Sequence, residues 1–98
     1  MRLCDYKEAA LYAGTVFRFS GKYPFEENVD FMLVCYPDTE SGFALYCISG
    51  YHKGSLEVCL PKEALGEACR TVSTEWVVKN WNEWIYQDCP VEAVSIII

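Results

Sequence analysis

The single histidine is the first residue whose type could support chemistry. His52 lies in the segment SGYHKGS near Ser49, Tyr51 and Ser55, so it could act as a base for a hydroxyl group. The sequence holds no GxSxG, HExxH, GxxxxGK or GxGxxG pattern that would fix a nucleophile, a metal or a phosphate. We therefore expect His52 to be an exposed loop residue, and we expect no catalytic residue, no cofactor and no enzymatic activity.

The cysteines are the second candidates. Among the six, Cys35, Cys47 and Cys59 recur at twelve-residue intervals, each within an expected strand. No CxxC pair occurs, although zinc sites usually include such a close pair of ligands. Free cysteine is among the most buried residue types, so we expect these three to be small apolar core residues rather than ligands of a metal.

Two acidic clusters with aromatic neighbours are the third candidates. Solvated loop charge explains such clusters without any partner, because loops carry charge for solubility. Carboxylates beside aromatic side chains also suit a docking surface for a basic protein. We take as candidate partner-binding residues Tyr23, Phe25, Glu26, Glu27 and Asp30 in the first cluster, and Asp38 and Glu40 in the second.

The charge balance restricts the class of partner. Fourteen acidic and eight basic side chains give a formal net charge of -6. Nucleic-acid binding draws its affinity largely from Lys and Arg that neutralise phosphates, so we expect no direct contact with DNA or RNA. An acidic surface attracts cationic proteins instead, and we expect a basic protein as the partner.

Length and hydropathy indicate a single domain over residues 1–98. Hydrophobic residues make up 52% of the chain, which is enough to form a core. No segment approaches the roughly 20 apolar residues of a membrane span. The charged residues Asp5, Lys7 and Glu8 lie where a signal peptide would need its apolar run. We therefore expect a cytoplasmic protein with reduced cysteines and no contact with a membrane.

Alternating and apolar patterns predict five strands, over residues 15–19, 29–36, 42–49, 55–60 and 91–98. In the first strand Phe17 and Phe19 should face the core. The second and third strands are almost continuously apolar, which is typical of central strands covered on both faces or nearly so, and they flank a turn at 37–42. In the fourth strand the alternation places Leu56, Val58 and Leu60 on one face.

Helical patterns occur at residues 1–13, 61–69 and 75–86. In the last segment Val77, Trp81, Trp84 and Ile85 share one face, so this helix should cover the sheet, whereas Trp76 should be partly exposed. The order of elements predicts an α+β fold: a mainly antiparallel sheet of about five strands with a Trp-rich helix packed on one face.

Three stretches together span much of the chain: GTVFRFSGKYPFEE, GFALYCISGYHKG and STEWVVKNWNEWIY. With them the chain resembles a bacterial immunity protein of a polymorphic toxin system, of the type paired with contact-dependent growth-inhibition toxins, and is similar to the immunity protein forty-five family. The resemblance implies a small cytoplasmic protein that binds one cognate toxin domain, frequently a nuclease, and blocks its active site or substrate approach. It carries over no catalytic or ligand residue. The alternatives are a small thiol- or histidine-dependent enzyme and a generic protein-interaction domain.

Overall fold

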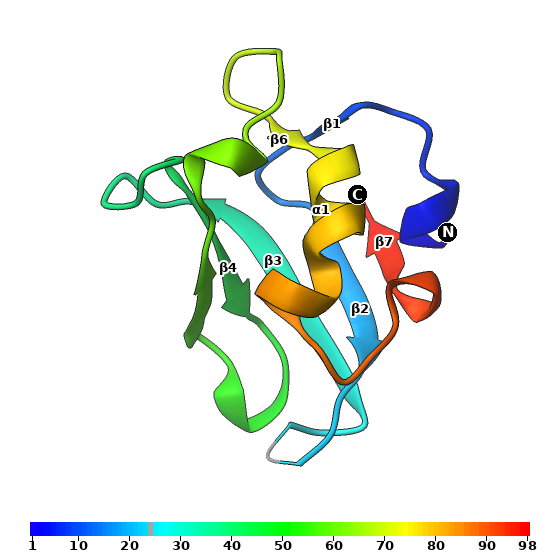
Figure 1. The fold of residues 1–98 in the computed structure, drawn as a ribbon. Coiled ribbons are helices and arrows are strands. Elements are labelled where there is room, and N and C mark those ends of the chain that lie inside the picture. Colours follow the sequence, from blue (N-terminus) through cyan, green and yellow to red (C-terminus); the bar gives the residue numbers. More distant parts are fainter. Residues whose placement is uncertain (24) are drawn as a thin grey trace.

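The computed structural model describes residues 1–23 and 25–98. It has an α+β fold with a five-stranded antiparallel sheet, ordered β5-β4-β3-β2-β7, and a two-stranded sheet, β1-β6 (Figure 1). The predicted fold class is thus confirmed. The elements are η1 (Leu3–Asp5), β1 (Ala10–Leu11), β2 (Val16–Ser20), β3 (Asn28–Cys35), β4 (Phe43–Cys47), η2 (Gly50–His52), β5 (Leu56–Cys59), η3 (Lys62–Ala64), β6 (Val72–Ser73), α1 (Thr74–Asn80), η4 (Trp81–Ile85), η5 (Val91–Ala93) and β7 (Ser95–Ile97).

The core lies between one face of the five-stranded sheet and the helix α1 with its continuation η4 (Figure 1). Alternation along each strand sends every second side chain to this face, and the register aligns these side chains across the sheet. Phe17 stands opposite Phe31, and Leu33 stands opposite Leu45. All four side chains are buried together with Trp81. The sequence prediction that Phe17 faces the core is confirmed.

The Trp-rich helix begins where the Ser73 hydroxyl accepts a hydrogen bond from the Trp76 backbone N–H at 3.2 Å, as an N-cap does. After seven α-helical residues it widens into the π-helical turn η4, closed by the Tyr86 N–H donating to the Trp81 carbonyl at 2.9 Å. The wider turn keeps Ile85 in the core and leaves Trp84 47% exposed. The expectation that Trp84 shares the buried face with Trp81 is therefore wrong.

Two predicted helices are absent. Residues 1–13 form only the short turn η1, and Ala10–Leu11 then pairs with Val72–Ser73 as strands β1 and β6. Residues 61–69 contain only the turn η3. Short helices are marginal without packing to stabilise them, and backbone pairing replaces the first one. Within residues 1–23 and 25–98, no helix is long and apolar enough to cross a membrane.

The edge strand β5 contains a register shift opposite Leu45 and Tyr46 of β4. Because of this bulge, Val58 stands opposite Leu45 and packs against the core, whereas Leu56 stands opposite Tyr46 on the other face. The prediction that Leu56 and Val58 share one face is therefore wrong. A one-residue slip reverses the direction of every side chain beyond it, and the sequence carries no signal for it.

The face of the sheet that points away from α1 also carries apolar side chains, and we call it the open face. Along β3 the buried positions Val29, Phe31 and Leu33 alternate with Met32 and Val34, which are half-buried. Central strands covered on both faces or nearly so were expected, and β3 is buried on the face toward α1 and half-buried on the other. Its nearly continuous apolar sequence therefore exceeds what the fold of this single chain requires.

All six cysteines are free thiols. Cys47 and Cys89 are buried, and Cys4, Cys35, Cys59 and Cys69 are exposed. The prediction of a small apolar core residue thus holds for Cys47 and is wrong for Cys35 and Cys59. Cys35 lies at the end of β3, and Cys59 stands opposite Ala44 on the open face, at the last position of the edge strand.

The segment before η1 lies beside β7, the other edge of the large sheet. Ile96 N–H donates to the Met1 carbonyl and Leu3 N–H donates to the Val94 carbonyl, both at 2.8 Å. Arg2 and Ser95 form an isolated antiparallel bridge between the same segments. These bonds cover part of an edge that would otherwise offer free backbone groups to another strand.

Candidate functional site

Two loops meet at one end of the five-stranded sheet, at the bottom of Figure 1. They are the β2–β3 loop and the β4–β5 loop that contains η2, and we call residues 21–23, 25–27 and 49–55 the two-loop end. The rings of Phe25 and His52 are in contact, tilted by 42° with centroids 4.5 Å apart, and the Glu26 carboxylate accepts a hydrogen bond from the Tyr51 N–H at 2.7 Å. The contacts fasten one loop to the other.

Two tyrosines project from this end into solvent. Tyr23 is 96% exposed and Tyr51 is 95% exposed. Glu27 is exposed beside them, and Glu26 is half-buried. Exposed aromatic side chains next to carboxylates combine a large apolar contact area with negative charge, which suits recognition of a basic protein surface.

Phe25 has a different place from the two tyrosines. Its ring contacts Phe31 at a centroid distance of 6.0 Å and Tyr86 at 5.8 Å, and it packs against the core. The Tyr86 hydroxyl accepts a hydrogen bond from the Lys22 N–H at 2.7 Å. Phe25 and Tyr86 therefore anchor the β2–β3 loop to the body of the protein, while Tyr23 remains available to a partner.

The Glu26 carboxylate holds the two loops together through its charge. Hydrogen bonds from the backbone N–H of Tyr51 and from its own N–H lower the pKa of Glu26; desolvation opposes this shift, and the nearby His52 adds a smaller lowering. Gly50 has a positive φ of 65°, and a Cβ at this position would collide with the Glu26 carboxylate. A glycine at position 50 thus satisfies both the left-handed backbone and the close approach of the carboxylate.

Replacing Glu26 by glutamine is expected to remove a pH-dependent part of the stability. The pKa of Glu26 is lower in the folded protein, so its contribution is fully present above the unfolded-state pKa of about 4.3 and is lost as the pH falls through the folded-state pKa. Thermal melts should therefore show a wild-type Tm above that of Glu26→Gln at pH 7, and the two should converge in acid. The control is Glu27→Gln, which leaves the Tyr51 contact in place. Identical pH profiles for the two variants would contradict this role for Glu26.

The structure places six of the seven sequence-predicted site residues in two groups. Tyr23, Phe25, Glu26 and Glu27 lie together at the two-loop end, where β3 begins. The other group, Asp38 and Glu40, lies in the turn between β3 and β4, at the far end of β3. Both of these side chains are exposed. The two acidic clusters are therefore not one contiguous site.

Asp30 belongs to neither loop, because it lies within β3 opposite Arg18 of β2. Its carboxylate accepts two hydrogen bonds from the Arg18 guanidinium, at 2.8 and 3.0 Å. This bidentate contact raises the pKa of Arg18, mainly through the hydrogen bond and then through the charge of Asp30. Asp30 is thus already paired within the chain and contributes no unbalanced charge to a partner.

Tyr51 and His52 are parts of the two-loop end that were not among the predicted partner-binding residues. His52 was expected to be an exposed loop residue, but it is half-buried against Phe25. The exposure of Tyr51 could have been predicted from the segment GYHKG, because an aromatic residue in a turn between two glycines lies away from the core. The contact between the loops has no signal in the sequence.

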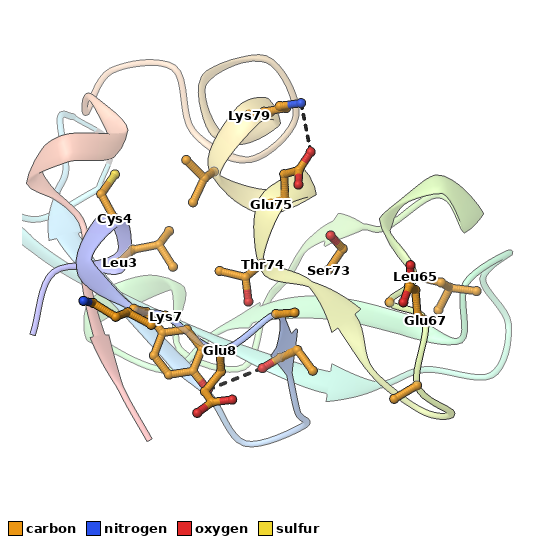
Figure 2. A pocket seen from close by; sticks show the side chains of 16 residues that line it. Leu3, Cys4, Lys7, Glu8, Leu65, Glu67, Ser73, Thr74, Glu75 and Lys79 are labelled. Atoms are coloured by element: carbon orange, nitrogen blue, oxygen red, sulfur yellow. Dashed lines mark hydrogen bonds and ion pairs between the residues drawn. The ribbon is translucent and has the colours of Figure 1, made fainter.

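A separate groove lies between the N-terminal segment and α1, with a volume of about 720 Å³ (Figure 2). Its walls include Lys7, Glu8 and Thr74, and Lys79 pairs with Glu75 at 2.9 Å on its rim. Within the described part of the chain, no group of three or more His, Cys, Asp or Glu residues could hold a metal ion. Side chains of both signs line the groove, so its lining does not select one class of ligand.

Comparison with known protein families gives one result. The family model described as Immunity protein 45 matches residues 3–96. Comparisons with curated proteins and with solved structures give no match. The matched range includes both loops of the two-loop end, the β3–β4 turn and the whole of α1.

Proposed function

This chain belongs to the immunity protein 45 family, and from that premise we propose that it binds one cognate toxin domain and neutralises it without catalysing a reaction. The proposed toxin is a basic nuclease domain of a contact-dependent growth-inhibition system, which the chain would bind in the bacterial cytoplasm. The chain would act by covering the toxin's active site or its substrate-binding surface.

The observation that carries the proposal is the exposure of Tyr23 and Tyr51 at the same end of the sheet as the exposed Glu27. Aromatic residues dominate the energetics of protein interfaces, and carboxylates increase the rate at which a cationic partner is captured. A formal net charge of -6 supports the same type of partner and opposes direct binding to nucleic acid. An enzyme or a metal-dependent function has no comparable support.

The test uses the toxin domain encoded beside the gene for this chain. The purified chain should bind that domain, inhibit its activity in vitro and protect cells that express it. An unrelated toxin domain serves as the control for specificity. Absence of binding to the neighbouring toxin, with both proteins folded, would reject the proposed function. Turnover of a substrate by the chain alone would favour the enzymatic alternative.

Charge reversal at the exposed acidic residues should slow association with the toxin. Glu27→Lys and the double variant Asp38→Lys/Glu40→Lys should each lower the association rate at low salt, by about tenfold for the double variant, because steering depends on long-range charge. Stopped-flow binding across a salt series measures this effect, which should shrink as salt screens the charges.

The matched controls are Glu92→Lys and Glu63→Lys/Glu92→Lys, which make the same charge changes in η5 and η3. Equal losses in the test and control sets would show that net charge alone matters and that neither acidic cluster is at the interface. Glu26 and Asp30 are left unchanged, because each makes a contact within the chain.

A further inference from the structure

The open face carries one row of apolar side chains that crosses all five strands. The register places Ile97, Val16, Met32, Tyr46 and Leu56 side by side, from the β7 edge to the β5 edge. Leu56 is 39% exposed, Ile97 is 40% exposed, and the three central residues are half-buried. The ring of Tyr36 extends the row, with its centroid 6.3 Å from that of Tyr46.

A row of this kind is unusual for a sheet face in contact with water. Antiparallel sheets with one solvated face typically alternate apolar residues inside with polar residues outside. Contiguous apolar patches on a protein surface mark sites of contact with another molecule. The adjacent row contains Arg18 and Asp30, whose opposite charges form an ion pair. The open face is therefore apolar and close to neutral at its centre.

The charge at the ends of the open face differs from that at its centre. The exposed Glu27 lies at the two-loop end, where β3 starts, and the exposed Asp38 and Glu40 lie in the turn where it finishes. A partner that covers the face along β3 would reach both acidic clusters. Its complementary surface would have an apolar centre between two cationic regions.

A second copy of this chain fits the open face less well than a basic protein does. In the aligned stacking of two sheets the strands lie within about 30° of each other, so the acidic ends of one copy would lie near those of the other. Like charges brought together oppose association. The charge pattern thus selects a basic partner.

We propose that the cognate toxin domain docks along the open face, with an apolar patch over Met32 and Tyr46 and with cationic side chains at both acidic ends. This inference rests on the proposed function and deepens it by assigning the contact surface. It explains why β3 and β4 carry the apolar side chains of Met32 and Tyr46 on the face that points away from α1. It also gives the two separated acidic clusters a common partner.

The first test compares two exposed leucines in complexes with the toxin domain encoded beside this chain's gene. Leu56 lies on the open face and is 39% exposed, and Leu65 lies outside the five-stranded sheet, bridged to Val72, and is 41% exposed. Leu56→Thr, and more strongly Tyr46→Thr, should weaken binding, with a loss of about 30-fold for Tyr46→Thr, whereas Leu65→Thr should bind as the wild type does. Equal affinities for all variants would overturn the assignment of the open face and leave the proposed function intact.

The second test uses the unmodified protein and so does not depend on the folding of a variant. Cys59 is exposed on the open face, and Cys69 is exposed in the loop before β6. Toxin binding should slow alkylation of Cys59 by iodoacetamide at least tenfold and leave Cys69 unchanged. If toxin binds while Cys59 reacts at its original rate, the assignment is wrong. Protection of Cys59 by high concentrations of the chain alone would show that a second copy covers the face and would also overturn it. Failure of the toxin to bind at all would reject the proposed function itself.

Discussion

Replacing Trp81 by alanine is expected to lower the free energy of unfolding by about 3 to 5 kcal/mol, the range for truncating a large buried aromatic residue. The Trp81 side chain is fully buried between the helix and the sheet. Its ring contacts Phe17 at a centroid distance of 5.8 Å and Phe19 at 5.3 Å. Alanine would leave a cavity at the point where the sheet and its covering helix meet, and both phenylalanines would lose packing contacts.

Trp84→Ala is the matched control, because the same residue type stands one turn further along the chain with 47% of its surface exposed. Trp84→Ala should lower the free energy of unfolding much less than Trp81→Ala does. The ring of Trp84 contacts that of Trp76, at a centroid distance of 5.8 Å. Urea denaturation followed by tryptophan fluorescence and far-UV circular dichroism measures both losses. Equal losses would mean that the wide turn η4 does not turn Trp84 away from the core.

Replacing Tyr23 and Tyr51 together by alanine is expected to weaken toxin binding by about 100-fold or more. Interface hot spots are enriched in tyrosine and cost at least about 2 kcal/mol each when truncated, although two neighbours do not add in full. The exposed fractions of 96% and 95% mean that neither side chain contributes burial to the isolated protein. The double variant should therefore keep the wild-type Tm while it loses affinity.

Tyr12→Ala is the control for this pair, because Tyr12 is 59% exposed and precedes β2, outside the two-loop end. Its affinity for the toxin should match that of the wild type. Isothermal titration calorimetry, together with growth protection in cells that express the toxin, provides the comparison. Full protection by the Tyr23 and Tyr51 double variant would mean that these two tyrosines do not carry the dominant contacts with the toxin.

The sheet was predictable from the sequence because its strands have strong local signals. Alternation in β2 and the apolar runs of β3 and β4 gave the strands, and the Pro37 turn gave the hairpin that joins the last two. The helix over the sheet followed from the spacing of Val77 and Trp81. These features depend on residues that are close in the sequence.

The wrong predictions concern features that depend on contacts between residues far apart in the sequence. Ala10 and Leu11 form a strand because β6, more than sixty residues away, offers a backbone to pair with. Leu56 leaves the core face because of the bulge opposite Tyr46. The strand order was not predicted at all, since β7 joins β2 across nearly the whole described chain.

In the candidate site, too, the local features were predictable from the sequence and the contacts between distant residues were not. The acidic and aromatic character of Tyr23, Glu26 and Glu27 was visible in the sequence, and the structure brings these residues together. The hydrogen bond from Tyr51 to Glu26 joins residues of different loops and could not be predicted. The separation of Asp38 and Glu40 from the other cluster follows from the length of β3, which stands between them.

The pairing of β7 with β2 also affects when the protein can act. The strands β2 to β5 are consecutive neighbours, so their hairpins can form as the chain leaves the ribosome. The backbone groups on the outer edge of β2 stay unpaired until residues 95–97 have been made, and β7 is synthesised last among the described elements. A contact between such distant residues is slow to form, because closing a long loop costs more conformational entropy. The sheet is thus complete only after nearly all of the described chain has been made, and an unfinished nascent chain would have a backbone edge that chaperones could bind.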